Sequence, residues 1–266
     1  MNILLIGDIT GSPGRDILKQ KLPSLKKKEA IDFVIANGEN IAGGSGITVD
    51  TFEELLAAGV DVVTSGDHIW KQKEVLTVFD NETQLLRPVN YPEGTPGRGA
   101  YIFHTKQNIT IGVINLLGSV FMGPIDCPFR SAAKAVQQLK NDTKIIFVDF
   151  HAEATSEKVA MGWHLDGLVS CVFGTHTHVQ TADERILQQG TAYITDLGMT
   201  GPFDSVIGRK KEQILERFLT HRPVRFQVAE KDIRINGAIV SIDDKTGKAL
   251  SIKRVQVAED KDLHSQ

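Results

Sequence analysis

Residues 168–178 read LVSCVFGTHTH, an apolar run of strand length that ends on a glycine and is followed by two histidines that alternate with threonines. The run shows little alternation between apolar and polar side chains. Strands that are covered on both faces have this character, which is typical of parallel sheets packed between helices. The segment therefore predicts an α/β fold in which polar residues collect just beyond the end of a buried strand.

The same pattern recurs along the chain. Six further runs have this length and composition: NILLIG (2–7), FVIANG (33–38), DVVTSG (61–66), TIGVIN (110–115), KIIFVDF (144–150) and TAYIT (191–195). Helical patterns at 51–59, 129–140 and 156–165 alternate with them, the last with Ser156 as its expected N-cap. Residues 225–257 alternate apolar and polar side chains around the turn DDKTGK, as antiparallel strands with one solvated face do. We therefore expect an α/β fold with a mixed sheet or a pair of sheets.

Length and composition suit one soluble domain. The 266 residues are 41% hydrophobic and 24% charged, and single hydrophobic cores stop growing at roughly 250 to 300 residues. No apolar run approaches the ~20 residues of a membrane-spanning helix, and Asp8 interrupts the N-terminal run too early for a signal peptide. We expect a single cytoplasmic domain over residues 1–266 that does not associate with a membrane, with residues 257–266 as a flexible tail.

Charge and cysteine content narrow the classes of partner. The net charge of -3 and the pI near 6.2 lack the basic excess that binding to a long nucleic-acid duplex requires. Cys127 and Cys171 lie far apart, which argues against a disulfide framework and a cysteine zinc site. The glycines after the first run form neither G-x-G-x-x-G nor G-K-[ST], which argues against a dinucleotide-binding oxidoreductase and a P-loop protein. Because homo-oligomers are common, a dimer is the default expectation.

Residues that can bind metal ions follow five of the predicted strands. They are Asp8, Glu39, Asn40, Asp67, His68, His151, His176 and His178. The carboxyl ends of strands in such sheets converge on one crevice, where crowded carboxylates repel one another unless cations neutralise them. Histidines and carboxylates without thiolates suit Mn²⁺, Fe²⁺/Fe³⁺ or Zn²⁺ rather than Ca²⁺ or a purely magnesium site. The set is large enough for two ions roughly 3.5 to 4 Å apart.

In two pairs of nearby residues, the directions of the side chains depend on the backbone conformation. In an extended segment residues i and i+2 point the same way, so His176 and His178 can face one centre. Adjacent residues point opposite ways, so Asp67 and His68 in TSGDHIW (64–70) have separate targets if that segment is extended. The local alternative is a dyad in which the acid orients the imidazole.

The order of these motifs resembles the calcineurin-like metallophosphoesterases, and most closely their bacterial YmdB-like branch. The resemblance rests on segments spread over nearly the whole chain: GDITGSPGR, ANGENIAGG, SGDHIWKQKE, DFHAEATSEK, FGTHTHVQTADERIL and YITDLGMTGP. It implies a four-layer α/β/β/α sandwich with two metal ions, usually iron or manganese. It also implies phosphodiesterase activity on small cyclic nucleotides such as 2′,3′-cyclic AMP.

Carried over by position, the resemblance implies two metal sites that share one carboxylate. The first would comprise Asp8, Glu39, Asn40 and His178, and the second Glu39, Asp67, His151 and His176, with Glu39 as the bridge. His68 would remain uncoordinated, close to the leaving-group oxygen. The usual residue of the branch at position 67 is Asn, so Asp67 adds one negative charge to the second site.

The resemblance also implies a mechanism in which a hydroxide that bridges the metals attacks phosphorus and His68 acts as general acid. Thr10, Glu153 and Ser156 are candidate substrate contacts, and Asp196 follows another strand as a candidate for lining the cleft. Two alternatives stay open: a phosphomonoesterase of the same superfamily, and a non-enzymatic metal-binding regulatory module.

Overall fold

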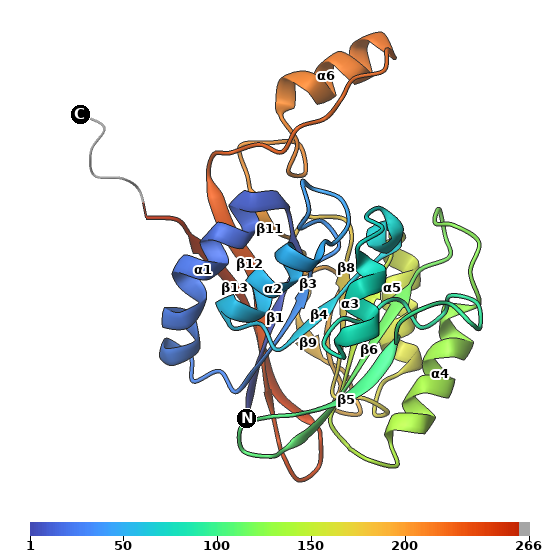
Figure 1. The fold of residues 1–266 in the computed structure, drawn as a ribbon. Coiled ribbons are helices and arrows are strands. Elements are labelled where there is room, and N and C mark those ends of the chain that lie inside the picture. The colour runs from blue at the N-terminus through green and yellow to red at the C-terminus, as the bar shows by residue number, and fades with distance from the viewer. Residues whose placement is uncertain (261–266) are drawn as a thin grey trace.

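Two mixed β-sheets packed face to face form the centre of the protein, which a computed structural model describes over residues 1–260 (Figure 1). The first sheet has the order β2-β11-β12-β1-β3-β4, with β13 paired to β12. Its strands are β1 (Asn2–Ile6), β2 (Asp8–Ile9), β3 (Phe33–Asn37), β4 (Val62–Thr64), β11 (Met199–Pro202), β12 (Ile233–Ile242) and β13 (Ala249–Ala258). The second sheet has the order β5-β6-β7-β8-β10-β9. Its strands are β5 (Ala100–His104), β6 (Thr110–Leu117), β7 (Ile146–His151), β8 (Cys171–Thr175), β9 (Arg185–Ile186) and β10 (Ala192–Ile194).

Helices cover the outer face of each sheet (Figure 1). The first sheet carries α1 (Gly11–Lys28), α2 (Val49–Ala58) and α3 (Val75–Asn81), and the second carries α4 (Pro128–Leu139) and α5 (Thr155–His164). Three hydrophobic clusters separate the layers, one between the sheets and one beneath each set of helices. The four-layer α/β/β/α sandwich that the sequence led us to expect is therefore confirmed.

Strand β1 explains why the predicted runs lack polar alternation. Leu4 and Ile6 pack toward the helices of the first sheet, whereas Ile3 and Leu5 pack against the second sheet. All four side chains are buried. Because both faces of the strand meet an apolar layer, the residues that point to either face are apolar.

The predicted strands and helices are all present, with ends shifted by a few residues, and β12 and β13 form the expected antiparallel pair. Two details of the prediction were wrong. Ala154, not Ser156, is the N-cap of α5, because the helix begins one residue earlier at Thr155. Val257 and Ala258 belong to β13, where they pair with Ile235 and Arg234 of β12, and not to a flexible tail. Residues 261–266 lie outside the described part of the chain.

One further helix, α6 (Lys211–Thr220), projects from the rest of the molecule (Figure 1). Only Ile214 of this helix is buried, and Phe218 and Leu219 are largely exposed. Within residues 1–260 none of the helices combines the length and the apolar character that a membrane crossing requires.

Candidate metal centre and catalytic hollow

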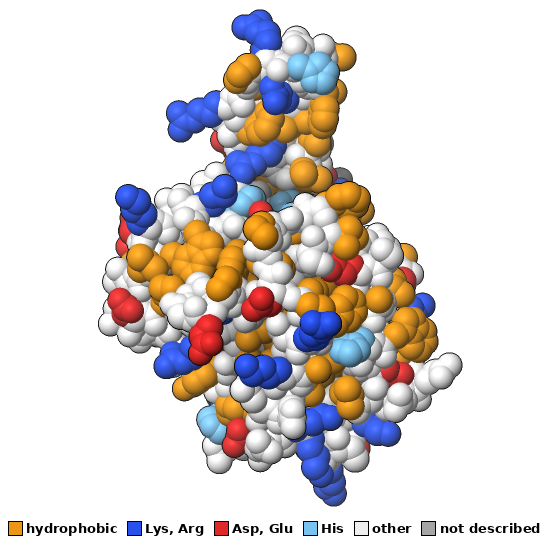
Figure 2. All heavy atoms as spheres, turned by 90° about the vertical axis from the view of Figure 1, so that its right-hand side faces the viewer, with side chains coloured by type: hydrophobic (Ala, Val, Ile, Leu, Met, Phe, Trp, Pro, Cys, Tyr) orange, Lys and Arg blue, Asp and Glu red, His pale blue; other side chains and the backbone are white. Residues whose placement is uncertain are grey.

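The predicted site residues meet at one edge of the sandwich. Strands β1, β3 and β4 run parallel in the first sheet, and β6, β7 and β8 run parallel in the second, so each set brings its carboxyl ends to one edge. A hollow of about 310 Å³ opens there. It is lined by Thr10, Glu39, Asn40, Gly44, His68, Glu153, His176, Thr177, His178, Ile207 and Arg209. Histidine side chains are visible in the crease between the projecting lobe and the body of the protein (Figure 2).

Four donors form a cluster at this edge, and two of them, Glu39 and His176, line the hollow. Ligand atoms of Glu39, Asp67, His151 and His176 all lie within 4.8 Å of one another. His151 Nε2 lies 3.2 Å from Glu39 Oε2, 3.5 Å from Asp67 Oδ1 and 3.0 Å from His176 Nδ1. Two imidazoles and two carboxylates in this arrangement can hold a metal ion, and these are the four residues that the resemblance implied for the second site.

The residues implied for the first site lie beside this cluster and share Glu39 with it. Asp8 Oδ1 lies 3.8 Å from His178 Nε2. Asn40 turns its amide nitrogen inward, 2.9 Å from Glu39 Oε1 and 3.3 Å from His178 Nε2. To bind a metal ion, Asn40 must direct its amide oxygen toward Glu39 and His178. Rotation of the side-chain amide by 180° places the oxygen there.

Two buried carboxylate oxygens indicate what the site lacks without a cation. Within residues 1–260, Asp8 Oδ1 and Asp67 Oδ1 are the buried side-chain atoms without a hydrogen-bond partner. Unpaired oxygens of this kind are costly to bury. Burial raises the pKa of Asp8 to about 7, which reflects the same cost. A bound cation next to both oxygens would remove this cost of burial, so the residues present fit a metal centre.

In each of the three candidate histidine ligands, the outer ring nitrogen, which faces away from the centre, lies within hydrogen-bond distance of an acceptor. His178 Nδ1 donates to the carbonyl oxygen of Ile207 at 3.1 Å, and His176 Nε2 lies 3.1 Å from Glu153 Oε2. His151 Nδ1 lies 2.9 Å from the hydroxyl of Thr175, which itself donates to a carboxylate. When these outer nitrogens carry the proton, the inner nitrogen of each ring presents a lone pair to the centre.

A buried polar network beneath His151 escaped the sequence-based prediction. Asp149 accepts from Thr175 at 2.7 Å, from Asn37 at 3.1 Å and from Thr64. Burial raises the pKa of Asp149 to about 6, and the three donors oppose that rise. The available signal was the single acid inside the apolar run KIIFVDF, because a charged residue in a fully buried strand requires partners.

The GTHTH segment is not extended, so that part of the prediction was wrong. His176 and His178 have φ values of 100° and 65°, in the left-handed region. Thr177 between them donates its backbone N–H and its hydroxyl to Asp196 Oδ2, at 3.2 and 2.8 Å. Asp196 also pairs with Lys158 at 2.6 Å, and both side chains are buried. Asp196 therefore lies beneath the loop and fixes its shape, rather than lining the hollow.

Asp67 and His68 also depart from extended geometry, since both lie in the 3₁₀ helix η1 (Asp67–Trp70). Their side chains nevertheless have separate partners. Asp67 Oδ1 approaches His151, whereas His68 Nδ1 lies 2.8 Å from Asn40 Oδ1. The shortest ion-pair distance between the two is 3.8 Å, which is too long for the hydrogen bond of a dyad.

The remaining candidates divide by position. His68, Thr10 and Glu153 line the hollow. Ser156 is exposed in the first turn of α5 and is not among the lining residues. The hydrogen bond to Glu39 raises the pKa of His68 above its usual value, which favours the protonated imidazole.

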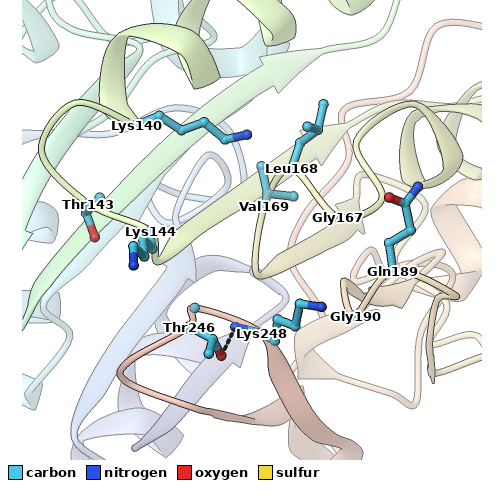
Figure 3. Close-up of a pocket in the computed structure, with 11 residues that line it drawn as sticks. Lys140, Thr143, Lys144, Gly167, Leu168, Val169, Gln189, Gly190, Thr246 and Lys248 are labelled. Carbon is cyan, nitrogen blue, oxygen red and sulfur yellow. Dashed lines mark hydrogen bonds between the residues drawn. The ribbon is translucent and has the colours of Figure 1, made fainter.

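A second hollow of about 260 Å³ lies between residues 140–144, 167–169, 189–190 and 246–248 (Figure 3). Lys140, Lys144 and Lys248 contribute to its lining, together with uncharged residues. None of its 11 lining residues is an aspartate, a glutamate or a histidine. This hollow therefore offers no ligand set for a metal, unlike the one at the carboxyl ends of the strands.

Comparison with known proteins agrees with the resemblance that the motifs indicated. The chain matches the model of the YmdB-like protein family over residues 4–255. It is 50% identical over 261 residues to the 2′,3′-cyclic-nucleotide 2′-phosphodiesterase of Bacillus subtilis (strain 168), with 98% of each chain covered. A crystal structure of a hypothetical protein from Thermus thermophilus matches with a TM-score of 0.92 and 39% identity, covering 98% of this chain and 100% of that one. A phosphatase structure from Mycoplasma pneumoniae matches with a TM-score of 0.91 and 38% identity, over 98% and 95% of the two chains.

Proposed function

Because the chain belongs to the YmdB-like family, we propose that it is a metal-dependent phosphodiesterase whose substrates are small phosphodiesters, foremost 2′,3′-cyclic nucleotides. The observation that carries this proposal is the pair of unpartnered carboxylate oxygens, Asp8 Oδ1 and Asp67 Oδ1, the second of which belongs to the four-donor cluster. Paired metal sites with a common carboxylate are the arrangement used for in-line attack on phosphate esters.

We assign two metal ions to the site, with Asp8, Asn40 and His178 around one, Asp67, His151 and His176 around the other, and Glu39 shared. The mixture of imidazole and oxygen donors supports iron or manganese and is also compatible with zinc. When bound, such ions lower the pKa of water toward about 7 and neutralise charge on the phosphoryl oxygens.

The chain's own residues supply the proton and the orientation. His68 lines the hollow without belonging to the four-donor cluster, and the hydrogen bond to Glu39 raises its pKa, which favours the protonated form. In our proposal a water molecule gives up one proton to solvent and its oxygen bonds to phosphorus, the bond from phosphorus to the ribose 2′-oxygen breaks, and His68 donates its proton to that oxygen. Glu153 holds the ring of His176 in the orientation that directs Nδ1 inward.

A side-by-side assay tests the function. With Mn²⁺ present, 2′,3′-cyclic AMP is expected to be hydrolysed with a higher kcat/KM than 3′,5′-cyclic AMP or p-nitrophenyl phosphate. Turnover should disappear with a chelator and in Asp8→Ala, because Asp8 is an assigned ligand. A preference for p-nitrophenyl phosphate would identify a phosphomonoesterase. Metal binding without turnover of any of these esters would identify a regulatory module.

Asp67→Asn is expected to retain activity but to shift the rising limb of the pH–rate profile to lower pH. Desolvation opposes ionisation of Asp67, but the nearby His151 outweighs it and lowers the pKa of Asp67, so the wild-type side chain is a charged carboxylate at neutral pH. Removing that negative charge makes nearby water more acidic, so the ionised nucleophile forms at lower pH. The profile of kcat against pH measures the shift, and superimposable wild-type and variant profiles would contradict the assignment of Asp67 to the metal.

A further inference from the structure

The catalytic hollow contains one permanently charged cation, Arg209, and no lysine among its lining residues. The guanidinium of Arg209 is partly buried and donates to the carbonyl oxygens of Gly43, at 3.4 Å, and Gly44. No carboxylate within residues 1–260 forms an ion pair with it, and burial lowers its pKa from the usual value. An arginine that loses water contacts without gaining a negative partner is costly unless a ligand provides the charge.

The backbone on both sides holds this arginine in place. Arg209 forms isolated bridges with Val206 and Val228, at the base of the segment that carries α6. Gly44 opposite it has a φ of 85°, and a Cβ there would lie 2.5 Å from a guanidinium nitrogen. The glycine thus leaves the space that the side chain occupies. The two carbonyls use two of the five N–H donors of a guanidinium, so further donors remain for a ligand.

We propose that Arg209 binds phosphate oxygens of the nucleotide substrate and sets the affinity of the enzyme for it. This inference rests on the proposed function and names the residue that recognises the anion. The planar fork of a guanidinium matches two phosphate oxygens, which makes arginine the residue best suited to this contact. The hollow also carries the charges of Glu39 and Glu153, which repel an anion. Arg209 offsets that repulsion on the approach of a phosphate.

The test compares Arg209→Gln with the wild-type enzyme on 2′,3′-cyclic AMP. We expect KM to rise about 10- to 100-fold, as for loss of a charge-assisted hydrogen bond, with a smaller change in kcat. The dissociation constant of inorganic phosphate, measured by calorimetry, should rise in parallel. Arg209→Lys should recover only part of the affinity, because an ammonium lacks the fork. Lys210→Gln is the control for net charge, since Lys210 lines a different hollow.

Two glycine variants separate displacement of the guanidinium from backbone strain. Gly44→Ala adds a methyl group where the guanidinium lies and should raise KM, whereas Gly94→Ala strains a backbone with the same φ of 85° outside the hollow and has no atom within 4 Å of its new Cβ. Gly94→Ala is therefore expected to keep the wild-type KM. A 5′-phosphorylated 2′,3′-cyclic nucleotide identifies which phosphate is bound: a KM increase confined to this compound assigns Arg209 to the 5′-phosphate, and an increase for both assigns it to the reacting phosphate.

The proposal fails if Arg209→Gln lowers the melting temperature but leaves both KM and the phosphate dissociation constant unchanged, because Arg209 would then only brace the loop at Gly43 and Gly44. Failure of the proposed function has a different signature. If the wild-type protein does not hydrolyse 2′,3′-cyclic AMP, phosphate calorimetry on the wild-type protein and on Arg209→Gln still reports whether the arginine binds the anion.

Discussion

Gly66→Ala is expected to lose bound metal and to reduce turnover by at least ~100-fold, as displacement of catalytic groups by about 1 Å does. A Cβ at this position would lie 2.2 Å from His151 Cδ2 and 2.3 Å from Glu39 Oε2. Both residues belong to the four-donor cluster and both are buried, so neither can retreat without abandoning the centre. Elemental analysis of the metal-loaded variant, together with hydrolysis of bis(p-nitrophenyl) phosphate, measures the effect.

The φ of Gly66, -151°, is not in the positive range that alanine avoids, so we attribute the expected effect to the added methyl group. Gly59→Ala is the matched control. Gly59 is the left-handed C-cap of α2, with a φ of 102°, and a Cβ there meets only Lys26 at 3.7 Å or beyond. That variant should lose stability, because alanine is strained at positive φ, yet keep its metal. A full metal complement in Gly66→Ala would refute the close packing of Gly66 against the centre.

The rule that polar residues converge at the carboxyl ends of parallel strands was sufficient to predict which residues come together. Asp8, Glu39, Asp67, His151 and His176 each follow or end an apolar run, and the parallel strands bring those ends to one edge, where Glu39 and His176 line the hollow. The rule works because it depends only on strand direction, which the uninterrupted apolar runs indicate. It does not depend on side-chain conformation.

The partners that orient the histidines could not be predicted in the same way. His178 is held by a backbone carbonyl, that of Ile207, and a carbonyl leaves no trace in the amino-acid sequence. Arg209 reaches Gly44 across 165 positions, from a segment with no periodic apolar pattern. The left-handed backbone at His176 and His178 is imposed by Asp196 and Thr177, so local propensity gave the wrong shape. Long-range contacts decided each of these features.

His68→Ala is expected to lower turnover of 2′,3′-cyclic AMP by about 10²- to 10⁴-fold while leaving the metal content unchanged. His68 lines the hollow and bonds Asn40 Oδ1, but it contributes no atom to the four-donor cluster. The loss should depend on the leaving group. A ribose alkoxide requires a proton as it departs, whereas p-nitrophenolate does not, so bis(p-nitrophenyl) phosphate should be hydrolysed at a rate much closer to that of the wild-type enzyme.

The pH dependence provides a second, independent measurement on the same variant. The hydrogen bond to Glu39 raises the pKa of His68, so the acid form persists above the usual histidine range and wild-type activity should fall only as pH rises through that raised value. In His68→Ala no such group titrates, and the falling limb for 2′,3′-cyclic AMP should disappear. Loss of one metal equivalent from the variant would instead make His68 a ligand. Equal losses with both leaving groups would mean that the imidazole stabilises charge without transferring a proton.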